Sequence, residues 1–379
     1  MSQPVIESVR AIVLTAELQE PWQFSVEAYD RSTCVVVEVS SSSGEVGYGE
    51  AITRRSPRTT ATLIEDLLDP IAVGRPTSDI GGIWADAVGT LRPWGHERGF
   101  LMEGVSGLDV ALWDLRAREL GISVSELLPG PTRRSVPTYA SSVYFQPTVD
   151  AAVNLATHVM DAGHRRLKIK IGYDPGAGGL ERDVEVVRAI HAAVPPGTPL
   201  MLDANSAYSL AEARILVEQL RSLSLHWLEE PLPPDDRTGY ADLAAWSPIP
   251  LAAGESEFSV FGFRDLLTSR SIAYAQPDIA RCGGFTGLLQ IASLCYAFNV
   301  AVCPHTGFSG GLNNLASLHV AASVQGTPTL EHMIIGNPLR EIFTAPLPEP
   351  VDGEIRVPDE PGLGHRLDPE KLRGFSEPG

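Results

Sequence analysis

Three acidic residues lie at equal intervals in the middle of the chain, and each follows a short apolar run. Asp203 follows PLML, Glu229 follows LHWL and Glu255 follows IPLAAG, with an interval of 26 positions in both cases. A strand, a turn, a helix and a return turn need about that many residues, so we expect each acid at the carboxyl end of one of three neighbouring parallel strands. Three converging carboxylates would repel one another. A cation such as Mg²⁺, which takes oxygen ligands, would remove that repulsion. The competing interpretation is three separate acids that bind solvent or arginines.

The same interval continues beyond Glu255. Asp278, His305 and Glu331 follow apolar segments at steps of 23, 27 and 26 positions. Active sites on α/β barrels are assembled from the carboxyl ends of several different strands. We therefore expect all six side chains to meet at one rim.

A lysine pair stands on the preceding predicted strand, LKIKIG. Lys168 and Lys170 are two positions apart and share one face, whereas Leu167, Ile169 and Ile171 share the other. Since the outer face of a barrel strand packs on helices, we expect the lysines to face inward. Two adjacent ammonium groups lower each other's pKa, which would fit one of them for work as a base. The alternative is a pair of surface lysines on an edge strand.

His305 and Asp278 are predicted to lie on adjacent strand ends, where the carboxylate could hold the imidazole and raise its basicity. Separately, His305 could be a core histidine and Asp278 a helix cap. His332 follows Glu331, and the sequence leaves its role open between substrate contact and structure. Three further histidines lie inside predicted strands or helices and are interpreted as structural: His158, His226 and His319.

Strands and helices alternate from about residue 136 to residue 333, and this pattern predicts eight parallel strands separated by seven helices, an arrangement that closes into an α/β barrel. Residues 1–50 instead show β-branched runs, with a loop predicted over 19–31, and residues 58–127 show helical periodicity. We predict an α+β domain over 1–128, a barrel over 129–337 and a separate C-terminal segment over 338–379.

Composition narrows the class of protein. The 379 residues carry a formal net charge of −18, which argues against a general nucleic-acid or anionic-membrane binder, because such proteins present a basic face. The N-terminus lacks the layout of a signal peptide, no apolar run reaches the length of a membrane span, and the four cysteines show no paired CxxC spacing. We expect a cytoplasmic protein with reduced thiols.

These residues could carry out one kind of chemistry. A cation on the three acids could bind a substrate carboxylate and stabilise the second negative charge that forms when the α-proton leaves, which gives an enediolate. Lys170 and His305 would approach from opposite sides as two bases. Glu331, if protonated, could donate a hydrogen bond to a carboxylate oxygen, and Asn205 could contact an α-hydroxyl.

The assembled motifs resemble those of the mandelate racemase subgroup of the enolase superfamily, over essentially the whole chain. The motifs are KIK at 168–170, DAN at 203–205, EEP at 229–231, GE at 254–255, QPD at 276–278 and PH at 304–305. The resemblance implies a modified (β/α)7β barrel beneath an N-terminal capping domain that the C-terminal tail completes. An aspartate at position 278, where the muconate-lactonizing subgroup has a lysine, argues against that subgroup.

The resemblance also implies roles. One Mg²⁺ per subunit would bind to Asp203, Glu229 and Glu255, Lys170 would be one base with Lys168 tuning it, and the His305–Asp278 pair would be the other. Substrate-specificity loops would lie around Trp22–Tyr29 and Thr53–Arg58. From these loops we single out Trp22 as substrate-binding, and Arg54, Arg55 and Arg58 as residues that are either surface arginines or contacts for a second carboxylate.

The leading functional prediction is Mg²⁺-dependent removal of the α-proton of a small carboxylate, in an acid-sugar (aldarate or aldonate) dehydratase or a lactone cycloisomerase. The alternative is a racemase or epimerase of a 2-hydroxy or amino acid, which would use the same two bases. A non-catalytic binding protein on this fold is the third hypothesis. We also expect a homo-oligomer, for which an octamer is one candidate assembly.

Overall fold

The computed structural model describes residues 3–131 and 133–377, and its N-terminal part is an antiparallel sheet covered by helices. The sheet has the order β1-β2-β3, and the long helix α4 packs across β2 and β3 to form the core of this unit. Its elements are β1 Ile6–Gln23, β2 Ala28–Ser41, β3 Val46–Ile52, α1 Pro57–Leu63, a π-helical turn Ile64–Leu68, α2 Asp69–Ala72, α3 Ile80–Leu91, α4 Phe100–Leu120 and α5 Val124–Leu127.

The second part is the predicted parallel barrel. Its strands pair in the order β10-β9-β8-β7-β6-β5-β4-β11, and every one of these neighbouring pairs is parallel. The strands are β4 Ser135–Val143, β5 Leu167–Lys170, β6 Leu200–Asp203, β7 Leu225–Glu229, β8 Leu251–Ala253, β9 Tyr274–Ala275, β10 Ala301–Val302 and β11 Leu330–Met333.

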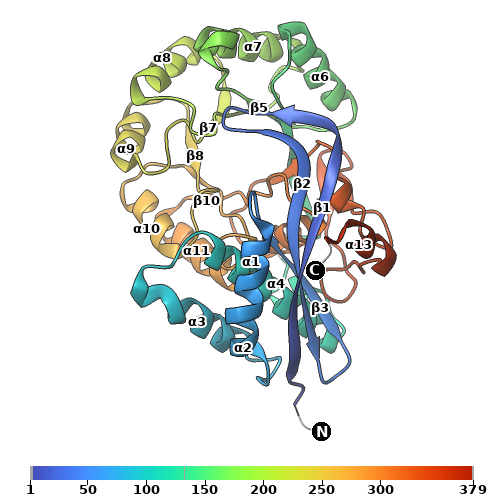
Figure 1. Ribbon diagram of the computed structural model, residues 1–379. Coiled ribbons are helices and arrows are strands. Elements are labelled where there is room, and N and C mark those ends of the chain that lie inside the picture. The colour runs from blue at the N-terminus through green and yellow to red at the C-terminus, as the bar shows by residue number, and fades with distance from the viewer. Residues whose placement is uncertain (1–2, 132, 378–379) are drawn as a thin grey trace.

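Seven helices alternate with these strands, and α6 to α11 form an arc around them (Figure 1). They are α6 Val149–Asp161, α7 Gly179–Ala193, α8 Leu210–Leu220, α9 Arg237–Trp246, α10 Val260–Thr268, α11 Gly284–Phe298 and α12 Gly311–Ser323. The sequence predicted seven helices between the barrel strands, and the structure confirms this number. The outer faces of the strands join these helices in one apolar core, and the inside of the barrel is filled by Tyr139, Met201, Trp227, Ala252 and Cys303.

The prediction of a long loop over residues 19–31 was wrong. β1 continues to Gln23, and Trp22 pairs with Tyr29 of β2, so that only the tip Phe24–Glu27 turns between the strands. The register shifts between Glu17 and Trp22, in the segment that contains Pro21. Proline has no N–H group to donate to a neighbouring strand, but an edge strand such as β1 tolerates it. The hairpin tip reaches the barrel, where Ser25 Oγ donates a hydrogen bond of 2.9 Å to the carbonyl of Ala204 (Figure 1).

The seam between β10 and β11 has no ladder pairs in the part of the chain that the structure describes. A side chain bridges it instead. Glu331 of β11 accepts hydrogen bonds from the backbone N–H groups of Thr306 and Gly307, which follow β10, at 2.8 and 3.0 Å. Glu331 therefore joins the two strands at the rim where the polar residues gather.

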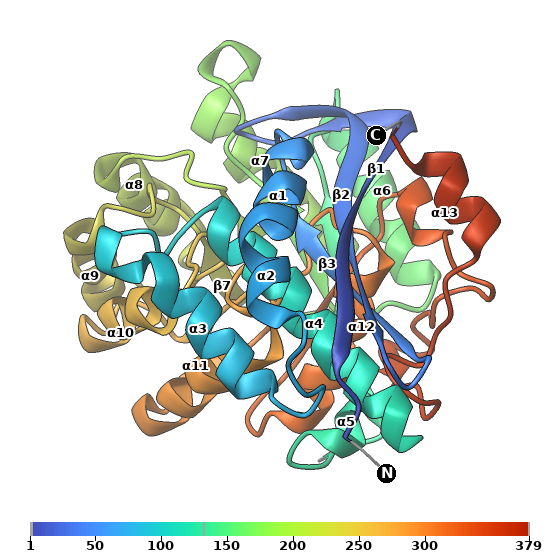
Figure 2. The same ribbon diagram turned by 60° about the horizontal axis from the view of Figure 1, so that its bottom comes forward.

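The C-terminal segment contacts both parts of the molecule. Its strand β12, Glu354–Arg356, pairs antiparallel with β4 of the barrel, which the sequence did not predict. Farther on, Leu363 N–H donates to Asp114 of α4, and helix α13, Pro369–Phe375, lies beside β1 (Figure 2). The domain boundaries at 128 and 337 stay a prediction. Among the described residues, no helix is both long enough and apolar enough to cross a membrane.

Candidate active site

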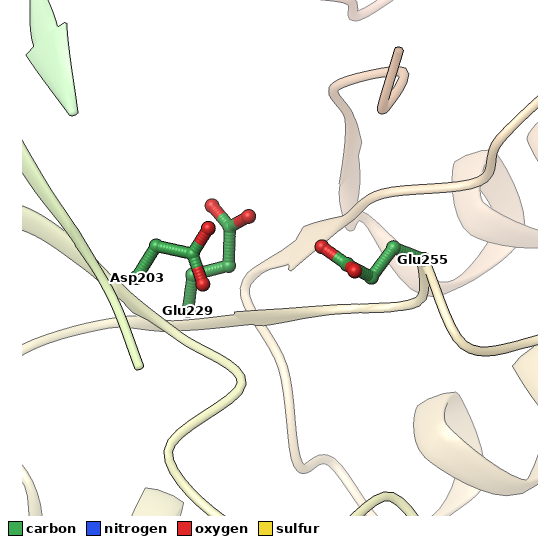
Figure 3. A group of neighbouring side chains, drawn as sticks. All are labelled: Asp203, Glu229 and Glu255. Carbon is green, nitrogen blue, oxygen red and sulfur yellow. The ribbon is translucent and has the colours of Figure 1, made fainter. Parts of the chain in front are cut away.

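Asp203, Glu229 and Glu255 meet at the carboxyl end of β6, β7 and β8, as their spacing predicted. All three are at most 5% exposed, and one carboxylate oxygen of each lies within 4.8 Å of the other two. Asp203 and Glu229 lie side by side and Glu255 faces them (Figure 3). Oxygen ligands at about 2.1 Å from a six-coordinate Mg²⁺ lie roughly 3 to 4.2 Å apart, so the three carboxylates lie near the separations that one ion requires.

The hydrogen bonds of these acids support a cation site. Glu255 Oε2 is buried without a hydrogen-bond partner, and His305 Nε2 lies 3.3 Å from it. Burial together with the charge of Asp203 raises the pKa of Glu229 above its usual range. A buried acceptor without a donor and mutually repelling carboxylates are both stabilised by a bound cation, so the residues present fit Mg²⁺.

Lys168 lies fully inside the barrel and pairs with three acids. Its Nζ is 2.6 Å from Glu229 Oε1, 2.7 Å from Glu331 Oε1 and 3.3 Å from Asp203 Oδ2. Burial alone would lower the pKa of Lys168, but the carboxylates of Glu229 and Glu331 outweigh burial and raise this pKa well above its usual range. The expected lowering of the pKa by the second lysine is therefore wrong for Lys168, because carboxylates rather than Lys170 are its direct partners.

Lys170 is the last residue of β5, two positions after Lys168, and lies at the rim of the barrel. Its Nζ lies 2.5 Å from Asp203 Oδ2 and 2.7 Å from Asn205 Oδ1, and it stands 5.3 Å from the centroid of the Phe24 ring. Asn205, for which we predicted a contact with substrate, thus holds Lys170 in place while also lining the cavity.

His305 and Asp278 form the expected pair on adjacent strand ends. The distance from His305 Nδ1 to Asp278 Oδ2 is 2.8 Å, and the imidazole is buried. Its other nitrogen, Nε2, faces Glu255 at 3.3 Å and Glu331 at 3.8 Å. Burial would lower the pKa of His305, but the charges of Glu255 and Glu331 and the hydrogen bond to Asp278 raise it to about 9.

We predicted that Glu331, if protonated, would donate a hydrogen bond to a substrate carboxylate. In the structure both of its oxygens accept instead. Oε2 accepts the two N–H groups at the seam, and Oε1 pairs with Lys168. Burial would raise the pKa of Glu331, but the charges of Lys168 and His305 hold it well below the usual range. Glu331 is therefore an ionised acceptor in this arrangement.

A small cavity of about 20 Å³ lies among these groups. Its lining includes Lys170 on one side and His305 on the other, so the structure brings the predicted bases to one space. Aromatic side chains from both domains close it: Trp22 stacks on Phe24 and Tyr29, and Phe308 meets Trp22 edge-on with ring centroids 5.2 Å apart.

Of the three arginines in the second predicted loop, only Arg54 reaches the cavity. Its guanidinium is 3.5 Å from Glu255 Oε1 and 3.4 Å from the hydroxyl of Tyr29. Arg55 pairs with Glu27 and Arg58 with Glu377, both in exposed positions.

The remaining histidines lie elsewhere. His332, whose role was left open, points to the outside of the barrel, where it pairs with Glu349 at 3.3 Å and stacks on His164. His319 is fully buried and accepts the N–H of Ser125. Burial lowers the pKa of His319 to about 4, which fits a neutral structural side chain.

Several cavity or supporting residues were not singled out from the sequence. Phe308 and Ser141 line the cavity, and Asn313 donates to Asp278 at 3.2 Å. Glu50 of the first domain lies behind Asn313. None of these belongs to the strand-end repeat, so the interval that revealed the other residues gives no signal for them.

Fold and site together define a capped, modified α/β barrel with a buried acidic triad between two candidate bases, the arrangement of the enolase superfamily. Residues 8–129 match the family described as the mandelate racemase / muconate lactonizing enzyme N-terminal domain. Residues 151–371 match the family described as enolase C-terminal domain-like. The chain belongs to the mandelate racemase subgroup of this superfamily, and it is an enzyme of the dehydratase or isomerase type.

Individual relatives carry different activities. D-galactarolactone cycloisomerase of Agrobacterium fabrum is 31% identical, over 98% of this chain and 99% of that one. Arabinonate dehydratase of Saccharolobus solfataricus is 28% identical over 88% of each chain. A racemase from Streptomyces coelicolor, solved with bound magnesium, is 26% identical with a TM-score of 0.90, over 98% of this chain and all of that one.

Proposed function

We propose that this protein removes the α-proton of an acid sugar and either eliminates water from it or isomerises its lactone. One observation carries the proposal: Lys170 and His305 line one cavity from opposite sides of the acidic triad, with Lys170 Nζ 2.5 Å from Asp203 and His305 Nε2 3.3 Å from Glu255. Two bases on opposite faces are what proton removal on one face and proton delivery on the other require.

The acidic triad would hold one Mg²⁺, through Asp203, Glu229 and Glu255. When bound, the ion supplies positive charge that stabilises the second negative charge forming on the substrate carboxylate as the α-proton leaves. Lys168 contacts Glu229 and Glu331 from inside the barrel, and its positive charge partly neutralises these two carboxylates.

In the dehydration, one base takes the proton from the α-carbon and the electron pair of that bond forms the new double bond. The β-hydroxyl departs as water after it receives a proton from the opposite base, and the resulting enol becomes a 2-keto acid. His305 is suited to donate this proton because Asp278 holds Nδ1 at 2.8 Å, which directs Nε2 toward the cavity. In the cycloisomerisation, the same proton removal breaks the bond between the β-carbon and the ring oxygen of the lactone, which leaves as a carboxylate, and the resulting enol becomes a 2-keto acid.

The second candidate is a racemase or epimerase, and the racemase among the structural relatives favours it. It would use the same two bases, because the proton removed on one face returns on the other with no leaving group. The product of the reaction, and not the set of site residues, distinguishes a racemase from a dehydratase or cycloisomerase.

Arg54 supports a substrate with a second carboxylate. Its guanidinium has five donors, yet its contacts in the site are Glu255 at 3.5 Å and Tyr29 at 3.4 Å, both longer than a good charged hydrogen bond. The side chain comes from the capping domain and lines the cavity beside Glu255. Arg54→Gln should raise KM for a six-carbon diacid more than for the corresponding monoacid.

The test is turnover of a panel of aldonic acids, aldaric acids and their lactones in D₂O with Mg²⁺. A 2-keto acid product, from an open-chain acid or from an opened lactone, with deuterium at the former β-carbon supports the proposal, because the enol takes up a solvent proton there when it becomes the keto acid. Inversion with exchange and without a keto product would establish the racemase. Lys170→Ala and His305→Asn serve as matched controls, and product formation that survives in both would remove these residues from the reaction.

A further inference from the structure

The carboxylate of Asp278 is held at more points than its pairing with His305 requires. Oδ2 faces His305 Nδ1, whereas Oδ1 accepts the backbone N–H of Ala280 at 2.9 Å and the side-chain amide of Asn313 at 3.2 Å. Asp278 is fully buried. The Asn313 amide therefore occupies the position from which it can fix the rotation of this carboxylate.

Asn313 is itself fixed on every side. Nδ2 also donates to the carbonyl of Thr306 at 3.3 Å, and Oδ1 accepts from Ser317 Oγ at 3.2 Å. Its backbone N–H donates to Glu50 Oε2 at 3.1 Å. Because both ends of the amide are occupied and the residue is 1% exposed, its orientation is determined by the hydrogen bonds.

Glu50 connects this arrangement to the capping domain. It lies on β3, is 2% exposed, and accepts the N–H of Gly310 as well as that of Asn313. Helix α12 begins at Gly311 after Gly310, which has no side chain to cap it, so a carboxylate from the other domain takes the place of a capping residue. A Cβ on Gly310 would lie 2.9 Å from Glu50 Oε2, which explains the glycine.

We propose that Asn313, anchored by Glu50 of the capping domain, is a positioning residue that keeps Asp278 oriented toward His305 Nδ1. With Nδ1 donating to Asp278, the neutral imidazole carries its lone pair on Nε2, the nitrogen that faces the cavity. Without the amide, Asp278 Oδ1 loses one donor, the carboxylate can rotate, and the imidazole loses its preferred tautomer. The inference rests on the proposed function only for its kinetic consequence.

The matched control is a second contact of the same kind. Asp109 of α4 is also a buried carboxylate of the capping domain that accepts hydrogen bonds at the start of a barrel helix, from Thr286 N at 3.0 Å and Thr286 Oγ1 at 2.6 Å. It makes no contact with Asp278 or His305 through these bonds. Asp109→Asn thus loosens the junction of the two domains without touching the histidine.

The first measurement is α-proton exchange in D₂O for the two epimers of the substrate at the α-carbon, whose α-protons face opposite bases, with Mg²⁺ present. Asn313→Leu should slow the exchange that depends on His305 by on the order of 10–100-fold, as for other partners that orient a functional histidine, and change the exchange that depends on Lys170 by less than about twofold. Asp109→Asn should leave the ratio of the two faces unchanged. Equal slowing on both faces in Asn313→Leu would overturn the inference, as would no change.

The second measurement does not need turnover. Nitrogen-15 NMR of His305 in the Mg²⁺-loaded protein, at a pH where the imidazole is neutral, should show the Nδ1–H tautomer in the parent and in Asp109→Asn, and a mixture in Asn313→Leu. An unchanged tautomer would overturn the inference. If Asn313→Leu does not fold, Glu50→Gln takes its place with a smaller shift expected in the same direction. A parent without proton exchange but with the tautomer change contradicts the proposed function and leaves the positioning role intact.

Discussion

The two sides of the site are built differently. On the lysine side, Lys168 and Lys170 project from one strand and contact the acids directly, so that their ionic partners belong to the barrel, and the Phe24 ring beside Lys170 comes from the capping domain. On the histidine side, His305 is held by Asp278, which contacts Asn313 in turn, and this series ends at Glu50 in the capping domain. The ion pairs of the lysine side are therefore set by the barrel, whereas the hydrogen bonds that orient the histidine extend into the capping domain.

The largest expected effect concerns the acids that both sides share. Removal of divalent ions by a chelator should abolish turnover, and Mg²⁺ should restore it, because charge stabilisation by the ion is worth several kcal/mol, or roughly 10³-fold or more in rate. Trp227 offers a direct signal, since its indole N–H donates to Glu229 Oε2 at 2.9 Å. A Mg²⁺-dependent change in fluorescence should disappear in Trp227→Phe. Full activity in the presence of the chelator contradicts the metal site.

The next prediction separates the two sides. Lys170→Ala and His305→Asn should each lower kcat by about 10²–10⁴-fold, the usual contribution of a positioned acid or base. With the two epimers of the substrate at the α-carbon, each variant should retain exchange for the epimer whose α-proton faces the remaining base, measured by mass spectrometry of substrate recovered from D₂O. Loss of exchange on both faces in one variant would show that the two sides do not act separately.

A substitution of Lys168 tests how much the ion pairs inside the barrel contribute to the stability of the protein. Lys168→Met removes the ammonium group that pairs with both Glu229 and Glu331, and loss of one partner in a buried ion pair costs about 3–5 kcal/mol. The free energy of unfolding in urea without metal should fall by this order. Mg²⁺ should restore more stability to this variant than to the parent, because the ion replaces part of the missing charge. Equal stabilisation by Mg²⁺ in both proteins contradicts this account.

The smallest expected effect is that of Glu50 on the free energy of unfolding, since Glu50 is the residue of the histidine side that is farthest along the series of contacts from His305. Burial raises the pKa of Glu50 from 4.5 to about 7, against hydrogen bonds from Asn313 and Gly310 that lower it. The folded state therefore binds this proton more tightly than the unfolded state, and the Glu50 contribution to stability is lost as the pH rises from about 4.5 to about 7. Glu50→Gln removes this contribution.

Urea unfolding of the parent and of Glu50→Gln across that pH range measures the effect. The stability of the variant should improve relative to the parent as the pH rises, by up to a few kcal/mol, and the difference should level off above about pH 7. Asp109, whose pKa burial also raises to about 7, should show the same trend in Asp109→Asn. A difference that does not depend on pH would mean that Glu50 titrates alike in the folded and unfolded states.

The sequence predicted the parts of the site that follow the barrel repeat. The 26-position interval placed Asp203, Glu229 and Glu255 together because each repeat returns the chain to the same rim, and the two-position alternation placed Lys168 and Lys170 inside. The interval also brought Asp278 to His305.

What the sequence did not predict depends on contacts between distant segments. Glu50 and Asn313 are 263 positions apart and belong to different domains, so no periodicity connects them. The ionised state of Glu331 follows from Lys168 and from two N–H groups across the seam, which a residue type cannot reveal. The strand through Trp22 was missed because Pro21 lies within it.

The tip of the β1–β2 hairpin has a consequence for the rate of the reaction. The space between the bases is about 20 Å³, little more than one water molecule occupies, and Ser25 at the tip is hydrogen-bonded to the strand that carries Asp203. The acid sugar that we propose as substrate is larger than this space, so we expect the hairpin tip, with Ser25 and the stack of Trp22 on Phe24, to move when substrate binds and when product leaves. This motion would be a step of each turnover, and we expect kcat to respond to solvent viscosity as well as to isotopic substitution of the α-proton.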